Sequence, residues 1–401
     1  MQKRDKLTLA VLCAAHFVND SYSSLIYPLL PLLKVKLGLS DTQVFWLSPL
    51  YSLTSSLMQP LYGIISDRYF RRFFAVCGPV LTGVFVSMIG LAPSYGMLIT
   101  LLVAGGVGIG SFHPQAAAMA SRASGSRKRV GMAMFSALGT LGFALGPFAI
   151  TRIVDRFGLE NSYPVVVVGL LMSAVLYRVC PPLDAPAKSA PTAKGQRSPL
   201  VAALHAAWKP LTLLYLITVI RSGLQITTSN YLPFLLSERG YNLTATGNVM
   251  TFFLLLGGIG GLVGGVMAER TSGRTVTLLS GLLAGPLMVA SFLTGGGLSL
   301  ILLGAGGFFL LSTLPVNVAM AQELAPGQTS TVSALMMGAA WGVGALAPQA
   351  LHPLVSGYGF RNTLILASAL TLLGAVCAYL LPRDEMHRLR ADAEMAVAAG
   401  D

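Results

Sequence analysis

Long apolar segments are the feature that most restricts how this chain can fold. A helix needs roughly 20 consecutive, mostly apolar residues to cross the hydrocarbon core of a bilayer. Only 10% of the residues are charged, against about 25% in a soluble domain. Twelve apolar segments follow one another, at 7–33, 44–65, 73–92, 97–120, 131–154, 163–180, 209–235, 245–268, 275–294, 298–322, 328–353 and 361–381. The sequence therefore predicts an all-α integral membrane protein with twelve transmembrane helices.

The positively charged residues are divided unequally between the two ends of these segments. If both termini lie on one side, that side holds 20 of the 27 Lys and Arg residues, the other side holds 6, and Arg221 alone lies within a segment. Cytoplasmic loops of membrane proteins carry such an excess of positive charge. We therefore predict a multi-pass protein of the bacterial inner membrane with both termini in the cytoplasm. The net charge of +12 is then a topology signal and does not indicate nucleic acid as a partner.

The two halves of the chain repeat one another. Residues 63–72 match 265–274 at an offset of 202, and the prolines at 114 and 147 match those at 315 and 348 at an offset of 201. Between the halves, residues 181–208 are rich in proline, alanine and lysine, a composition typical of a flexible linker. We predict an N-terminal six-helix bundle at 1–180, a cytoplasmic linker at 181–208, and a C-terminal six-helix bundle with a short tail at 209–401.

Two motifs resemble those of a known transporter family. They read Gly63-x-x-x-Asp67-Arg68-x-x-Arg71-Arg72 after the second segment and Gly139-x-x-Gly142-x-x-x-Gly146-Pro147 in the fifth. The first resembles the loop signature of the major facilitator superfamily, and the second resembles its glycine-proline motif, found mainly in antiporters. The resemblance implies two pseudo-symmetric six-helix bundles that work by alternating access. In the second half, Glu269 stands in place of the signature aspartate and Gly273 in place of a basic residue.

The N-terminal half is also similar to the fosmidomycin resistance family of drug exporters. The segments that carry this similarity are His16-Phe17-x-x-Asp20, Tyr27-Pro28-Leu-Leu-Pro31, Gln59-Pro60-Leu61 and Phe112-His113-Pro114-Gln115. The similarity implies the export of small compounds across the membrane.

Asp20 is the only acidic residue deep within a predicted segment. A carboxylate in the bilayer is costly, so such a residue is a functional candidate by default. His16 lies one helical turn earlier on the same face, and histidine titrates near neutral pH. We predict that Asp20 is the proton-coupling site, assisted by His16, with His113 as a second candidate. The alternative is a structural pair that holds the first helix against a neighbour.

Arg221 is the only cation deep within a segment. The resemblance implies that the first and seventh helices both line a central cavity, where Arg221 would bind an anionic substrate group or face Asp20. A guanidinium suits a carboxylate or phosphonate because it can bond to both oxygens. A fixed salt bridge between the halves is the alternative. The further candidates for substrate binding are Gln115, Asn19, Gln225 and Asn230.

The charged residues of the loop signature are expected to gate access rather than to bind substrate. The resemblance implies that Asp67 contacts the start of the eleventh helix, where residues 329–331 have the chemistry of a helix cap. An anchor for topology is the alternative. The candidates for gating are Asp67, Arg68, Arg72, Glu269 and Arg270.

The sequence contains no signature of an enzyme. There is no P-loop, no Gly-x-Ser-x-Gly motif, no metal-ligand spacing among the four cysteines, and no soluble domain. We predict a monomeric, proton-coupled exporter of small anionic or amphipathic compounds, without a cofactor or metal and with the proton gradient as its energy source. The alternatives are a uniporter or lipid flippase and, from a different class, a membrane sensor that does not transport.

Overall fold

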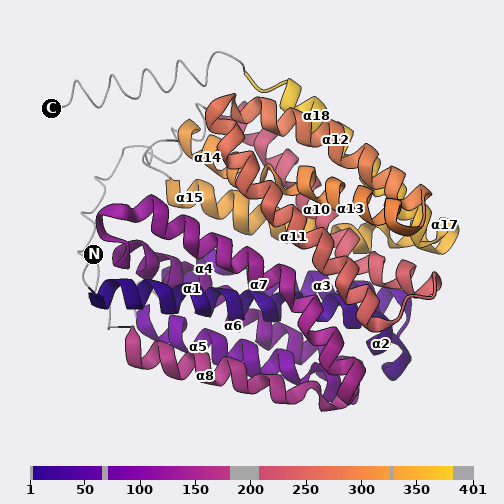
Figure 1. Ribbon diagram of the computed structural model, residues 1–401, viewed down its shortest axis with the longest axis horizontal. Helices are drawn as coiled ribbons and strands as arrows, with labels where there is room; N and C mark the ends of the chain where they lie inside the picture. The colour runs from indigo at the N-terminus through magenta and orange to yellow at the C-terminus, as the bar shows by residue number, and fades with distance from the viewer. Residues whose placement is uncertain (1–2, 66–70, 181–206, 326–328, 383–401) are drawn as a thin grey trace, which may run out of the picture.

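The computed structural model describes residues 3–65, 71–180, 207–325 and 329–382, and within these ranges the chain forms long helices that lie side by side (Figure 1). The first bundle contains α1 Lys3–Ser24, α2 Ile26–Leu37, α3 Asp41–Ser52, η1 Leu53–Leu57, α4 Gln59–Ile65, α5 Arg71–Ser87, η3 Met88–Leu91, α6 Tyr95–Ala123, η4 Gly125–Arg127, α7 Lys128–Phe157, η5 Glu160–Val165 and α8 Val166–Val179. The second contains α10 Trp208–Glu238, α11 Leu243–Arg270, α12 Gly273–Leu293, α13 Gly296–Leu311, α14 Leu314–Leu324, α15 Thr329–Ala334, η6 Leu335–Ala339, α16 Ala340–Gly344, α17 Ala347–Ala369 and α18 Thr371–Tyr379.

These helices group into twelve rods, which confirms the predicted architecture. Nine continuous stretches of the described residues are long and apolar enough to cross a membrane. The last of them, 332–379, would be about 70 Å long at 1.5 Å per residue, more than twice the bilayer core, and it turns back at Gly359 (φ 75°). The stretches 3–37 and 41–65 provide the two remaining rods.

The turns between rods follow from ordinary capping chemistry. Gly38 and Gly240 both have positive φ, at 59° and 79°, a conformation that glycine adopts without steric cost. Ser40 forms a capping box with Gln43 at the start of α3. The first rod breaks at Leu25, three residues before Pro28, whose ring would clash with the carbonyl one turn earlier in a continuous helix. We call the end of the molecule that carries these turns the loop face, and the end at which α8 stops and α10 starts the linker face.

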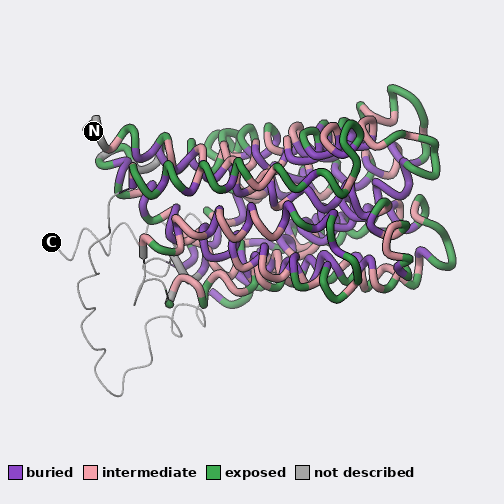
Figure 2. The backbone as a smooth tube through the Cα atoms, turned by 90° about the horizontal axis from the view of Figure 1, so that it is seen from below, coloured by how far each residue is buried: buried purple, intermediate pink, exposed green. Residues whose placement is uncertain are grey.

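The duplication seen in the sequence recurs in the side-chain contacts. Arg72 donates to the carbonyl oxygen of Tyr177 and lies over its ring, and 202 residues later Arg274 makes the same two contacts with Tyr379. In Figure 1 the α1–α8 bundle lies below the α10–α18 bundle. Figure 2 shows buried residues along the interior of the rods and exposed ones along their outer faces. The linker predicted at 181–208 lies almost entirely outside the described residues and stays a prediction.

The two bundles contact each other at the loop face and along α7 and α11. At the loop face α2 packs on α10 and α3 packs on α17. The ring of Phe45 lies 4.8 Å from that of Tyr231 and 6.1 Å from that of Phe360, and Ser48 donates a buried hydrogen bond of 2.6 Å to Asn230. Along the middle of the molecule, α7 packs against α11. In this conformation the loop face is therefore sealed by aromatic and hydrogen-bonded contacts between the halves.

Candidate functional site

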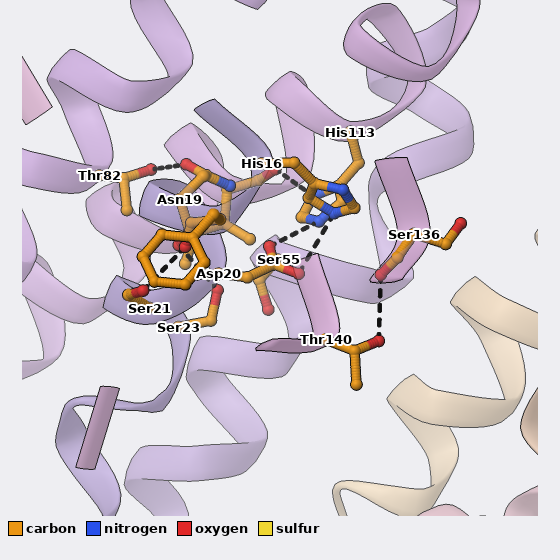
Figure 3. A network of polar contacts seen from close by, with 12 residues as sticks. His16, Asn19, Asp20, Ser21, Ser23, Ser55, Thr82, His113, Ser136 and Thr140 are labelled. Carbon is orange, nitrogen blue, oxygen red and sulfur yellow. Dashed lines mark hydrogen bonds and ion pairs between the residues drawn. The ribbon is translucent and has the colours of Figure 1, made fainter. Parts of the chain in front are cut away.

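Three titratable side chains from two helices converge in the first bundle. On α1, His16 and Asp20 are four residues apart and share one face, and His16 Nε2 lies 3.2 Å from Asp20 Oδ2. His113 on α6 approaches from the other side, with its Nε2 3.0 Å from Asp20 Oδ1. Figure 3 shows both imidazole rings directed at the one carboxylate. The structure thus brings together the three residues predicted to carry protons.

Backbone carbonyls hold both histidines in one tautomer. His16 Nδ1 lies 2.8 Å from the carbonyl oxygen of Phe135, and His113 Nδ1 lies 2.7 Å from that of Ile109. A carbonyl oxygen can only accept, so each Nδ1 carries a hydrogen. Each Nε2 atom then has an unprotonated lone pair unless a second proton binds to the ring. An unprotonated Nε2 and a carboxylate oxygen repel each other, because both are electron-rich.

The proton count of the cluster follows from these contacts. Two attractive Nε2···O contacts need two protons, one on each side of the carboxylate, so the fully bonded cluster has one negative and two positive charges and a net charge of +1. Loss of one proton makes the cluster neutral and turns one hydrogen bond into a repulsive contact. The geometry of His16, Asp20 and His113 therefore depends on bound protons.

The ring of His16 rests directly on α7. It stacks on the ring of Phe135 at a centroid distance of 4.0 Å, and its edge lies against Gly139. A Cβ at position 139 would lie 2.7 Å from His16 Nδ1, which is well inside van der Waals contact. Sequence reasoning identified Gly139 only as part of the glycine-proline motif and did not single out Phe135. The glycine-proline motif drew attention to Gly139, but only the fold shows that the ring of His16 packs against it.

The cluster is accessible as well as largely enclosed. The exposed fractions are 16% for the Asp20 side chain and 23% for that of His113, so water and protons can reach them. Within the described ranges, His16, Asp20 and His113 also form a group that could hold a metal ion, with their ligating atoms within 4.8 Å of one another. A divalent ion would satisfy the same electrostatic need as two protons. The prediction of no metal stays a prediction.

Arg221 on α10 is buried without an acidic partner among the described residues. It is 3% exposed, its Nη1 donates to Gln225 Oε1 at 3.3 Å, and its guanidinium carbon lies 5.3 Å from the centre of the Trp341 ring. Its Nε and Nη2 atoms have no hydrogen-bond partner in the described structure. The predicted alternative in which Arg221 faces Asp20 is not formed in this conformation, because Asp20 is engaged by the two histidines of its own bundle.

The four further candidates for substrate binding lie in different surroundings. Asn19 is fully buried and accepts a hydrogen bond of 3.0 Å from Thr82. Gln115 is buried, and its Oε1 has no partner in the described structure. Gln225 accepts from Arg221, whereas Asn230 accepts from Ser48 across the sealed interface. Gln225 thus belongs to the Arg221 site, and Asn230 contributes to the closure of the loop face.

The gating candidates are only partly described. Asp67 and Arg68 lie outside the described residues, as do the side chains of 329–331 with which Asp67 was expected to interact. Arg72 contacts Tyr177 within its own bundle. Glu269 and Arg270 are exposed at the end of α11.

Comparisons with known proteins agree with this architecture. The model of the Major Facilitator Superfamily matches residues 12–348. An uncharacterized MFS-type transporter of Bacillus subtilis, YfnC, is 28% identical over 386 residues, which are 95% of this chain and 94% of that protein. The fosmidomycin resistance protein of Escherichia coli K12 is 27% identical over 388 residues, which are 95% of this chain and 93% of that protein.

Among solved structures, a bacterial homologue of the human lysosomal transporter Spinster, in an inward-facing and unoccupied conformation, superposes with a TM-score of 0.77. The two proteins are 16% identical over 98% of each chain. Similarity at this level of identity shows the common fold.

Proposed function

This chain belongs to the major facilitator superfamily, a family of membrane transporters and not of enzymes, and on that premise we propose that it exports small anionic or amphipathic compounds in exchange for protons. The proposal names the cluster of His16, Asp20 and His113 as the proton site and Arg221 as the site for the anionic group of the substrate. The two sites belong to different bundles, on α1 and α6 and on α10. Movement of one bundle against the other can therefore couple them.

The observation that carries the proposal is the arrangement of two histidine Nε2 atoms around one carboxylate, with both Nδ1 atoms already bound to carbonyls. Both Nε2···O contacts are attractive only when two protons, or a divalent ion in their place, are bound, and the side chains of Asp20 and His113 are partly exposed. A change in protonation is therefore also a change in the contact between α1 and α6. This is the kind of element through which a proton gradient can drive a conformational change.

Arg221 supports the choice of an anionic substrate. A buried cation with two unpaired donor groups is costly, and a carboxylate or phosphonate would satisfy both donors.

The charge asymmetry of the loops supports an orientation of this conformation in the membrane. With the linker face in the cytoplasm of a bacterial inner membrane, the sealed loop face is the outer one. The conformation described here would then be closed toward the outside.

The test is gradient-driven transport by the purified protein in proteoliposomes. Because a relative is a fosmidomycin resistance protein, radiolabelled fosmidomycin is the first substrate to measure, with and without an imposed pH gradient. We expect wild-type protein to accumulate it against its gradient only when the pH gradient is present. Asp20→Asn should abolish uphill accumulation and retain downhill exchange.

The matched control is Glu238→Gln, which neutralises an exposed acidic residue at the end of α10 and should behave as wild type. Uphill transport by Asp20→Asn equal to that of the control would place the coupling site elsewhere. Accumulation by wild-type protein that is indifferent to the pH gradient would favour a uniporter.

A further inference from the structure

A cavity of about 310 Å³ opens at the loop face of the second bundle, apart from both sites described above. Its walls come from α10, α11, α12, α13 and α17. The lining residues include two arginines, Arg239 and Arg361, and none of them is acidic. Leu232, Leu236, Val249 and Leu303 form much of its apolar wall.

The two arginines meet at a single acceptor. Arg239 Nη2 and Arg361 Nε each donate a hydrogen bond of 3.0 Å to the carbonyl oxygen of Phe292. One carbonyl oxygen carries only a partial negative charge, so two guanidinium groups held beside it repel each other. Each guanidinium has five N–H donors, and one of each is used here. The remaining N–H donors of both guanidinium groups can therefore bind an anion.

The first bundle is an internal control for this arrangement, because its equivalent site is neutral. At an offset of 201, Gly158-Leu159-Glu160-Asn161 matches Gly359-Phe360-Arg361-Asn362, and both glycines have positive φ. Both asparagines also donate to the backbone carbonyl four residues earlier in the chain, at 2.9 and 3.0 Å. The two segments therefore share one local backbone frame.

Within this shared backbone frame the acidic residue Glu160 of the first bundle is replaced by the basic residue Arg361 in the second. In the first bundle Lys36 donates to the carbonyl oxygen of Gly90 and forms an ion pair of 2.7 Å with Glu160. In the second bundle Arg239 takes the place of Lys36 and Arg361 takes the place of Glu160. The second bundle thus has two cations where the first has an internal salt bridge.

The adjoining helix start differs in the same sense. In the first bundle α6 is capped by Ser94, whose side chain accepts from the backbone N–H of Met97. The equivalent residue of the second bundle, 201 positions later, is Gly295, which gives α13 no side-chain cap. Gly295 and Gly296 line the cavity, so the positive end of the α13 dipole faces the same space as the arginines.

From the charge reversal, the missing cap and the cavity, we propose that this cavity binds a phosphate group, held by Arg239, Arg361 and the start of α13. The apolar wall suits the glycerol and first acyl carbons of a phospholipid, and inorganic phosphate offers the same group without them. The site lies on the second bundle alone, so it can be occupied whatever the relative position of the two bundles. It does not depend on the proposed export activity.

The test measures ligand binding to the full-length protein in nanodiscs and in detergent. Phosphatidylglycerol and phosphatidylcholine are titrated by native mass spectrometry, and inorganic phosphate is titrated by its effect on thermal unfolding. The decisive variant is Arg361→Glu, which recreates the salt bridge of the first bundle. It should fold, because the introduced carboxylate would pair with Arg239 as Glu160 pairs with Lys36. The matched control is Arg156→Glu, an equal change of charge at the exposed end of α7 on the same face.

We expect wild-type protein and Arg156→Glu to bind phosphatidylglycerol in preference to phosphatidylcholine. Arg361→Glu should bind phosphatidylglycerol at least about tenfold more weakly, which is the loss expected for a charge-assisted hydrogen bond. Binding of inorganic phosphate with the same dependence on Arg361, and no preference between the lipids, would identify a free anion as the ligand. Equal binding of both phosphate-bearing probes to wild type and Arg361→Glu would overturn the proposal.

Discussion

The contact between Gly139 and His16 allows a small mutation to test the proton cluster. In Gly139→Ala the new Cβ would lie 2.7 Å from His16 Nδ1, whereas ordinary contact needs about 3.5–4.0 Å. The imidazole must therefore move away from α7 by about 1 Å. Phe135 lies on α7, so this movement stretches the 2.8 Å bond between His16 Nδ1 and the Phe135 carbonyl beyond the limit for a hydrogen bond.

The size of the effect follows from the bond that is lost. A hydrogen bond to a charged group contributes about 1.5–3 kcal/mol, which corresponds to roughly a tenfold to hundredfold change in an equilibrium. We expect uphill export by Gly139→Ala to fall by at least about tenfold. Overpacking of this kind also lowers the free energy of unfolding by about 1–3 kcal/mol.

The assay pairs export in proteoliposomes with thermal unfolding of the same preparations. Gly96→Ala is the control, because a Cβ at that helical position meets no atom within 4 Å. His16→Ala removes the ring, so adding Gly139→Ala to it should cost no further stability. The reasoning is refuted if Gly139→Ala transports as well as Gly96→Ala, or if it destabilises the His16→Ala background as much as the wild type.

Two further predictions concern the substrate site and the topology. Arg221→Gln should weaken binding of anionic compounds more than that of neutral ones, because the Nε and Nη2 atoms of Arg221 have no partner in the described structure and can donate to an anion; equal losses for both classes, with poor expression, would point to a structural role. Reporter fusions within 181–208 and after residue 401 should both indicate the cytoplasm, since 20 of 27 Lys and Arg residues lie on that side; a periplasmic signal at either position would contradict the assigned orientation.

Local properties of the sequence were sufficient to predict the architecture. Apolar length sets the number of membrane crossings, and the recurrence of residues 63–72 at 265–274 revealed the duplication, because both signals depend only on the order of residues along the chain. The pairing of His16 with Asp20 was predictable for the same reason, since residues four apart share one face of a helix.

The partners that come from other helices were decided by packing. The orientation of α6 places His113 beside Asp20, whereas the sequence also allowed Arg221 to face that carboxylate. The carbonyls of Phe135 and Ile109 select the tautomers of the two histidines, although backbone carbonyls carry no signature in the sequence. The 201-residue offset places Glu160 and Arg361 at equivalent positions, but only the tertiary structure shows that Glu160 pairs with Lys36 whereas Arg361 shares one carbonyl acceptor with Arg239. Hydropathy and helical periodicity are properties of a single segment, while a binding site depends on the rotation and offset of several helices, which their combined packing determines.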